Sequence, residues 1–332
     1  MATSFLSVEA KEEIWSLKQP FRISRGSRTE ARVVVVMLGD GKHVGRGEGV
    51  PLARYNQDIR SVLAQIESIK PTTNLNRQAL QDFLPPGAAR NALDCASWDL
   101  EAKASGKRAW ELANIPIVSE LETSFTISLD TPEKMAASVA QARDFGMAEI
   151  LKLKLGGDDL DLSRVEVVRG TAPAARLLVD ANESWSVQHY QKIAPALQKL
   201  GVQLIEQPFA ANADGVLETL DHPIPICADE SCHTAADLPR LMNRYEVVNV
   251  KLDKTGGLTE ALRLCSRAAE TGFKYLIGCM ACTSLAIAPA RLLASAADYV
   301  DLDGPLLLAS DRLNGLTYRD SKVGIPHRQL WG

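Results

Sequence analysis

Carboxylates follow three successive apolar segments in the middle of the chain. The segments end in Asp180-Ala-Asn, Glu206-Gln-Pro and Asp229-Glu-Ser. If the segments are parallel strands of a β/α barrel, their carboxyl ends meet at one mouth, where Asp180, Glu206 and Asp229 could bind one hard cation. A single acid there can instead cap a helix, but three on consecutive strands favour a metal site. Because oxygen ligands suit Mg²⁺ and no His or Cys occupies these positions, we predict one Mg²⁺ per subunit.

Lysines precede and follow these acids in the sequence. Lys152 and Lys154 are separated by one apolar residue and so share one face of a strand, which we expect to be the barrel interior rather than a solvated edge. Two neighbouring ammoniums and a nearby cation predict a lowered pKa for at least one of them, as a general base requires. Lys251 follows a later strand, across the metal site. A carboxylate substrate on the cation would have one amine on each face of its α-carbon, so a proton removed through an enediolate could return on the other face.

The segments that must position these side chains alternate with amphipathic helical stretches at a period of about 22 to 28 residues. Helical spacing is clear in Met135–Phe145 and Leu258–Thr271. This alternation predicts an α/β fold with a (β/α)₈-type, TIM-like barrel. The eight predicted strands are Thr123–Ser128, Ile150–Leu155, Leu177–Ala181, Gln203–Gln207, Ile226–Asp229, Val247–Leu252, Tyr275–Met280 and Tyr299–Asp303.

The amino-terminal third has a different pattern. Residues 5 to 50 alternate apolar and polar between turn residues, which predicts a β-meander, and helical spacing follows from Asp58 to about Lys70 and from Ala88 to Ala113. Glycines between 39 and 49 do not open a helix, which argues against a dinucleotide-binding loop. We predict an α+β capping domain at 1–120, the barrel at 121–312, and a segment at 313–332 that returns to the capping domain.

Composition excludes several partner classes. The 332 residues carry a formal charge of -4 with scattered basic residues, which argues against nucleic acid and anionic membranes. Acidic residues in MATSFLSVEAKEEIW argue against a secretory signal, and no apolar run reaches the ~20 residues of a membrane span, so we predict a cytoplasmic protein. Six cysteines, including Cys279-x-x-Cys282, are better explained as small buried side chains than as a zinc or redox site. A homo-oligomer is compatible with the sequence but not specified by it.

The order Lys-x-Lys, Asp-Ala-Asn, Glu-Gln-Pro, Ala-Asp-Glu-Ser and Lys-x-x-Lys-x-Gly-Gly resembles the muconate-lactonizing-enzyme subgroup of the enolase superfamily. The resemblance runs from the capping domain to the carboxyl terminus. It implies that Lys154 is a base assisted by Lys152, that Lys251 is the opposing acid or base, and that the three carboxylates hold Mg²⁺. Lys254 would be a neighbour only.

Asp301-Leu-Asp303 at the eighth strand resembles the dipeptide epimerases, where such a pair receives the substrate's α-ammonium. An aspartate pair in a turn or cap is the alternative. Arg25, in the capping loop, suits an anionic side chain such as glutamate, and Thr126 on the first strand is also assigned to substrate binding. Three stretches resemble bacterial L-Ala-D/L-Glu epimerases: Arg25–Arg28, Ala88–Asp94 and Gly278–Ser284.

The resemblance therefore implies a Mg²⁺-dependent epimerase that inverts the α-carbon of the carboxyl-terminal residue of a small-molecule dipeptide by two-base 1,1-proton transfer, in murein peptide catabolism. A different dipeptide specificity is one alternative. A cycloisomerase or o-succinylbenzoate synthase would share the metal site, but its amine-free substrate would leave Asp301 and Asp303 unexplained. A non-catalytic barrel that binds dipeptides or partners would have no need of both lysines together with three carboxylates.

Overall fold

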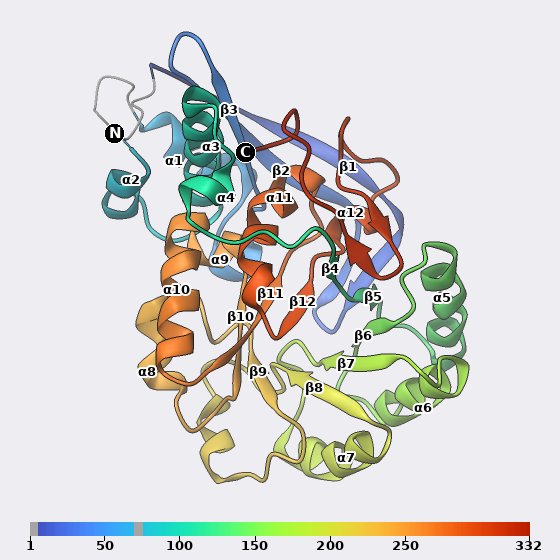
Figure 1. The fold of residues 1–332 in the computed structure, drawn as a ribbon. Helices are drawn as coiled ribbons and strands as arrows, with labels where there is room; N and C mark the ends of the chain where they lie inside the picture. Colours follow the sequence, from blue (N-terminus) through green and yellow to red (C-terminus); the bar gives the residue numbers. More distant parts are fainter. Residues whose placement is uncertain (1–5, 70–75) are drawn as a thin grey trace.

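The computed structural model describes residues 6–69 and 76–332, which form an α+β layer packed on a β/α barrel (Figure 1). Residues 1–5, and Lys70 where one predicted helical stretch ends, lie outside the described part of the chain. Within that part, no helix combines the length and the apolar character needed to cross a membrane.

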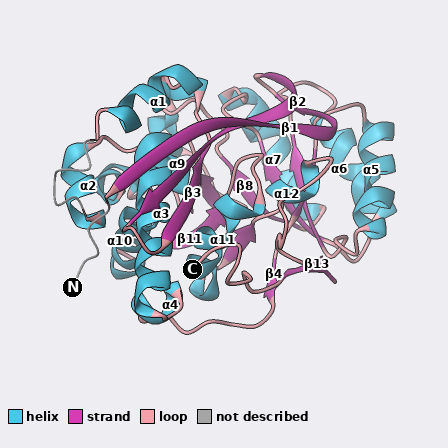
Figure 2. Ribbon diagram, turned by 90° about the horizontal axis from the view of Figure 1, so that it is seen from above, coloured by secondary structure: helices cyan, strands magenta, loops and turns pink. Residues whose placement is uncertain are grey.

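The amino-terminal layer is an antiparallel meander covered by helices, as the sequence predicts. Its strands are β1 (Ser7–Ile23), β2 (Gly26–Gly39) and β3 (Val44–Gly49), in that order. Alternate apolar side chains of β2 pack against three helices. These are α1 (Ile59–Glu67), α2 (Arg77–Phe83) and α3 (Ala88–Ser105), and the short α4 (Ala109–Leu112) follows. Seen from above, β1 and β2 extend past the helices and over the barrel (Figure 2).

The glycines of β3 set the distance between sheet and helix. Gly45, Gly47 and Gly49 alternate along the strand and face α3. A Cβ at any of the three would lie within 2.3 Å of a carbonyl oxygen of α3. The glycines of β3 thus let α3 pack directly on the strand. This close packing accounts for the glycines without a nucleotide-binding loop.

Eight parallel strands form the barrel in chain order. Its first and last strands are joined where Ser124 N–H donates to the Val300 carbonyl (3.0 Å), which closes the sheet. All eight predicted segments are strands, but each ends one or two residues before its predicted end because the chain turns into a loop there. They are β5 (Phe125–Ile127), β6 (Ile150–Lys154), β7 (Arg176–Asp180), β8 (Val202–Glu206), β9 (Ile226–Ala228), β10 (Val247–Val250), β11 (Lys274–Gly278) and β12 (Tyr299–Asp301).

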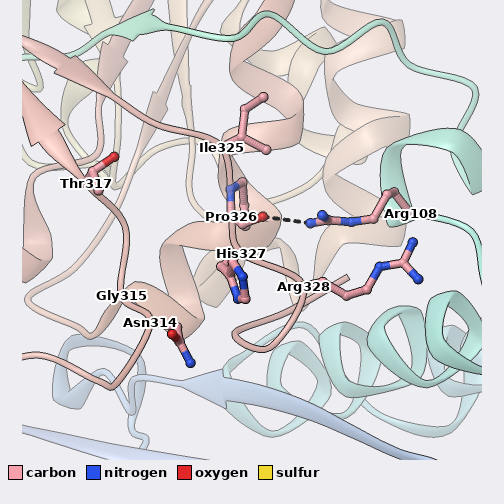
Figure 3. Close-up of a pocket in the computed structure, with 8 residues that line it drawn as sticks. All are labelled: Arg108, Asn314, Gly315, Thr317, Ile325, Pro326, His327 and Arg328. Atoms are coloured by element: carbon pink, nitrogen blue, oxygen red, sulfur yellow. Dashed lines mark hydrogen bonds between the residues drawn. The ribbon is translucent and has the colours of Figure 1, made fainter.

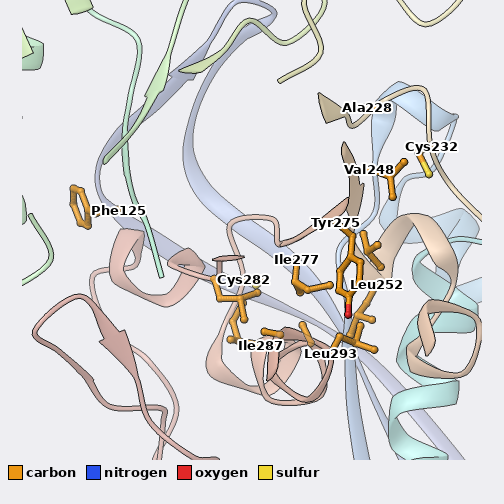
Figure 4. Close-up of a cluster of buried hydrophobic side chains, with 14 of the residues drawn as sticks. Phe125, Ala228, Cys232, Val248, Leu252, Tyr275, Ile277, Cys282, Ile287 and Leu293 are labelled. Atoms are coloured by element: carbon orange, nitrogen blue, oxygen red, sulfur yellow. The ribbon is translucent and has the colours of Figure 1, made fainter. Parts of the chain in front are cut away.

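Helices surround the barrel and bury its outward-facing side chains. Figure 4 shows part of this core, where Ile277 lies near Ile287 and Leu293 of a covering helix and Val248 lies near Cys232. Short segments, η2 (Asp214–Thr219), η3 (Ala235–Asp237) and α8 (Leu238–Leu241), connect β8 to β10. The longer covering helices are α5 (Pro132–Asp144), α6 (Asp161–Thr171), α7 (Val187–Lys199), α10 (Leu258–Glu270) and α11 (Ser284–Leu293).

After the barrel, the chain returns to the amino-terminal layer. α12 (Gly304–Leu307) leads to β13 (Tyr318–Arg319) and β14 (Lys322–Val323), and β14 pairs with β4 (Leu121–Glu122). Near the end of the chain, Trp331 Nε1 donates to the Cys95 carbonyl of α3 (3.0 Å). Figure 3 shows the adjoining cavity, where Arg108 donates to the Pro326 carbonyl (2.8 Å). Both ends of the chain therefore build the capping layer, while the boundaries at 120 and 312 stay predictions.

We predict that Gly47→Ala lowers the free energy of unfolding by about 2–3 kcal/mol or more, because its methyl group would lie 2.1 Å from the Ala92 carbonyl oxygen. Gly170→Ala is the matched control. Gly170 lies in α6 with no neighbouring atom within 4 Å of the place a methyl group would take, so this variant should gain up to ~1 kcal/mol from helix propensity. Denaturant unfolding measures both. Equal stability of the two variants would contradict the close contact between β3 and α3.

Candidate active site

Along five of the barrel strands, the inner face changes from apolar side chains to charged or amide side chains. Ile150, Leu178, Leu204, Cys227 and Val247 form an apolar layer inside the sheet. Two residues further along the same strands come charged or amide side chains, because side chains two apart share a face. These are Lys152, Asp180, Glu206, Asp229 and Asn249. The predicted catalytic and metal-binding residues therefore lie inside the carboxyl end of the barrel.

Asp180, Glu206 and Asp229 form the compact acidic cluster that the sequence predicts. Each offers a carboxylate oxygen within 4.8 Å of those of the other two, and all three are buried. Asn249 Nδ2 donates to Glu206 Oε1 (2.8 Å), and lysine ammoniums lie 2.6 Å from Glu206 Oε2 and 2.6 Å from Asp229 Oδ1. Three buried carboxylates this close together form an all-oxygen set that fits a hard divalent cation such as Mg²⁺.

The three carboxyl groups differ in their electrostatics. Burial raises the pKa of Asp180, but Lys154 and Lys152 outweigh it and lower the pKa to about 2. Burial, followed by the charge of Asp180, raises the pKa of Glu206 to about 7. Burial also opposes ionisation of Asp229, yet Lys251 and Lys254 hold its pKa well below the usual range. Glu206 is thus the ligand whose ionisation most needs a cation.

The two lysines of β6 are held differently. Lys152 Nζ lies 2.6 Å from Glu206 Oε2, 2.7 Å from Asp301 Oδ2 and 3.4 Å from Asp180 Oδ2. Among the described residues, Lys154 Nζ pairs only with Asp180 Oδ2, at 2.5 Å. Burial would lower the pKa of Lys152, but the carboxylates of Asp301, Glu206 and Asp180 raise it well above the usual value. The predicted lowering of a pKa by like charge is therefore wrong for Lys152, because opposite charges surround it.

Lys251 follows β10 and begins α9 (Leu252–Thr255). Its Nζ donates to Asp229 Oδ2 at 2.7 Å. Burial lowers the pKa of Lys251, but Asp229 and Glu206 outweigh it and raise the pKa above its usual value. Lys154 and Lys251 thus lie at opposite ends of the acidic cluster, next to Asp180 and Asp229. Lys254, which the resemblance makes a neighbour only, forms an ion pair with Asp229 Oδ1 at 2.6 Å.

Asp301 and Asp303 lie beside the first barrel strand. Ser124 Oγ donates to Asp301 Oδ1 (2.6 Å), whose other oxygen pairs with Lys152. Thr126 N–H donates to Asp303 Oδ2 (2.6 Å). Burial, followed by the charge of Asp301, raises the pKa of Asp303 to about 7. Asp303 is therefore a buried acid without a cationic hydrogen-bond partner among the described residues, whereas Asp301 already has one.

A cavity of about 410 Å³ joins these groups to the capping layer. Capping residues that line it include Arg25 and Tyr55, the latter in η1 (Ala53–Tyr55). Arg25 is not a free cation, because its guanidinium pairs with Glu230 at 2.6 Å and Glu183 at 3.1 Å. Barrel residues in the lining include Thr126, Lys152, Lys154, Asn182, Asp229, Glu230, Lys251, Cys279, Met280, Asp301 and Asp303. The cavity in Figure 3 has no lining carboxylate or lysine.

The sequence interpretation gave no role in the site to four residues of this region. Asn249 carries a signal, because it lies two residues before Lys251 and so faces inward with it. Lys254 lies one helical turn after Lys251, which places both on one side of the same turn. The contact of Glu230 with Arg25 and the position of Tyr55 join segments far apart in the chain, and no local pattern indicates them.

Comparison with known proteins places the chain in a family. Residues 6–113 match the family model described as the mandelate racemase/muconate lactonizing enzyme amino-terminal domain, and residues 134–328 match the enolase carboxyl-terminal domain-like model. The chain belongs to the mandelate racemase/muconate lactonizing enzyme family of the enolase superfamily. It is 47% identical to the L-Ala-D/L-Glu epimerase of Escherichia coli K12 (92% of this chain, 95% of the relative). It is 43% identical to the N-acetyl-D-glutamate racemase of a Pseudoalteromonas species (90% and 95%).

Solved structures of family members share the whole fold. A member from Agrobacterium tumefaciens with homology to dipeptide epimerases, with bound sodium and L-Ala-L-Glu, has a TM-score of 0.94 at 46% identity and covers 98% of this chain and 99% of its own. The dipeptide epimerase of Cytophaga hutchinsonii, complexed with Mg and D-Ala-L-Val, has a TM-score of 0.90 at 27% identity (96% and 92%).

We predict that chelator-treated protein binds one Mg²⁺ per chain in isothermal titration calorimetry and that Glu206→Gln abolishes this binding, because a neutral amide replaces one of three ligands. Glu230→Gln is the control, because Glu230 is buried beside the cluster but is not one of its three ligands. Loss of its charge should weaken Mg²⁺ binding by no more than about tenfold. Undiminished Mg²⁺ binding by Glu206→Gln would contradict the assignment.

Proposed function

We propose that the protein is a Mg²⁺-dependent dipeptide epimerase with L-Ala-D/L-Glu as its preferred substrate pair. The observation that carries this proposal is the placement of Lys154 and Lys251 at opposite ends of one acidic cluster, with both lysines lining the same cavity. Two amines on either side of a carboxylate-binding position are what inversion of an α-carbon requires. The relatives named as epimerases support the same activity.

The lysines would perform the proton transfers. Lys154 removes or returns the proton on one face of the α-carbon, and Lys251 acts on the other. Lys152, held by three carboxylates, stays charged beside them. Mg²⁺ bound by Asp180, Glu206 and Asp229 would supply positive charge for the substrate carboxylate as the α-proton leaves. An ammonium cannot accept a proton, so the lysine that acts as the base must first lose its own proton and its carboxylate contact, and cation binding to the same carboxylates would favour both.

The acids at β12 support a substrate with a free amine. Asp303 has no cationic partner among the described residues, and a substrate ammonium would supply one. An N-acylated amino acid, the substrate class named for the Pseudoalteromonas relative, brings no charge to this position. Asp301, Thr126 and Arg25 keep their predicted roles in substrate binding. The guanidinium of Arg25 already pairs with Glu183 and Glu230. It would bind the glutamate side chain of the substrate through the N–H groups that these two pairs do not use.

We further propose that the enzyme acts on murein peptides in the cytoplasm, without nucleic-acid or membrane partners, with each subunit of any homo-oligomer binding one Mg²⁺. The dipeptide ligands in the related structures support the substrate class.

The decisive screen incubates the protein with Mg²⁺ in D₂O and follows deuterium uptake at each α-carbon by NMR and mass spectrometry. We expect epimerisation and exchange at the carboxyl-terminal residue of L-Ala-L-Glu, much slower turnover of N-acetylglutamate, and none of either in excess chelator. Faster turnover of N-acetylglutamate would contradict dipeptide specificity. Exchange with neither substrate would reject the proposed epimerase.

The pKa of Asp303 predicts a pH dependence. Because its pKa is raised to about 7, the carboxyl group is neutral below that pH and gains the charge that binds an ammonium above it. We expect the KM for L-Ala-L-Glu to fall as pH rises through about 7 and to rise again above about pH 8, where the substrate's α-ammonium loses its proton. In Asp303→Asn the KM should be high and lose this dependence, whereas the KM for an N-acetylated dipeptide should change little. An unchanged profile in the variant would remove Asp303 from ammonium binding.

A further inference from the structure

The buried lysines of the site fall into two kinds. Lys154 and Lys251 line the cavity and each contacts a single carboxylate oxygen. Lys254 is equally buried but does not line the cavity. An ammonium that cannot reach the substrate has no direct part in proton transfer, so its contacts must explain its presence.

Three contacts hold Lys254 in place. Its Nζ donates to the backbone carbonyls of Asp229 (2.5 Å) and Asn249 (2.8 Å). Asp229 directly follows β9, and Asn249 belongs to the neighbouring strand β10. The same Nζ lies 2.6 Å from Asp229 Oδ1. This contact is an ion pair whose geometry does not meet that of a hydrogen bond. Lys254 thus contacts both the main chain and the side chain of Asp229.

The segment that carries Lys254 is itself anchored. Lys251 precedes the single turn of α9, and Lys254 lies within that turn, so the two side chains are on the same side of it. The ammonium of Lys251 contacts Asp229 Oδ2, and that of Lys254 contacts Asp229 Oδ1. Between them, Asp253 Oδ1 accepts hydrogen bonds from Val50 N–H and Asn91 Nδ2, both of the capping layer and both at 2.8 Å. The turn is therefore fixed to the capping layer as well as to the barrel.

We infer that Lys254 is a positioning residue that orients Asp229 for the metal ion, while Lys251 on the same carboxylate is the mobile, reacting amine. This inference rests on the proposed Mg²⁺ site. Two bonds to main-chain carbonyls keep the Lys254 ammonium stationary, whereas Lys251 has a single contact that it can leave. Residues that orient metal ligands affect metal affinity or activity by about 10- to 100-fold.

The direction in which Mg²⁺ affinity changes when Lys254 is replaced distinguishes a residue that orients Asp229 from one that acts only through its positive charge. A fixed positive charge near a divalent cation repels it, so removal of the charge alone would tighten Mg²⁺ binding. If Lys254 orients Asp229, removal must weaken binding despite the lost repulsion. A role in stability alone would lower the unfolding temperature and leave Mg²⁺ affinity unchanged.

The test is calorimetric titration of Mg²⁺ into chelator-treated Lys254→Met, whose side chain keeps the length but not the charge. We expect the Kd for Mg²⁺ to rise by about 10- to 100-fold. Lys251→Met is the matched control, because it removes the same charge from the other oxygen of Asp229. Its Kd should stay equal to the wild-type value or decrease.

Thermal unfolding of the metal-free variants completes the test. If Lys254→Met fails to fold, Lys254→Gln replaces it, because the amide can still donate to a carbonyl without carrying charge, and the same rise in Kd is expected. An unchanged or lower Kd in the folded Lys254 variant overturns the inference, as does an equal rise in Lys251→Met. Because titration of Mg²⁺ needs no turnover, absence of epimerase activity would reject the proposed function without affecting this result.

Discussion

The structure depends on the confinement of many charges at one end of a barrel whose other layers are apolar. Six carboxyl groups and five cationic side chains meet there, nearly all buried: Asp180, Glu206, Asp229, Glu230, Asp301, Asp303, Lys152, Lys154, Lys251, Lys254 and Arg25. A buried charge is tolerated only when opposite charge compensates it. Each lysine therefore pairs with a carboxylate, and lysine ammoniums contact all three carboxylates of the acidic cluster.

This constraint explains why the capping layer and the barrel pack so closely. The glycines of β3 bring α3 onto the sheet, and Asn91 of α3 then reaches Asp253 in the turn between Lys251 and Lys254. Arg25 crosses in the other direction to Glu183 and Glu230. The capping layer thus closes the cavity and fixes the barrel loops that carry its charged groups, so catalysis and domain packing depend on the same contacts.

Much of the site follows from sequence because period two places residues on the inner face of a strand. Lys152, Asp180 and Glu206 occupy such positions, and the eight strands and the acidic cluster were predictable on that basis. The pKa of Lys152 was not, because it depends on Asp301, which is 149 residues away in the chain. The same holds for the Arg25 pairs and for the contact of Lys254 with Asp229. Local pattern predicts which face a side chain occupies, whereas partners across the barrel require the fold.

Stereospecific α-proton exchange in D₂O shows whether Lys154 and Lys251 act on opposite faces of one α-carbon. With Lys154→Ala and Lys251→Ala, each supplied separately with L-Ala-L-Glu and L-Ala-D-Glu, we expect no net epimerisation. We also expect slow exchange with retained configuration, on one isomer for the first variant and on the other isomer for the second. Exchange of both isomers by either variant, or appreciable epimerisation by either, would contradict the two-lysine mechanism and assign the proton transfers to a single base or to another residue.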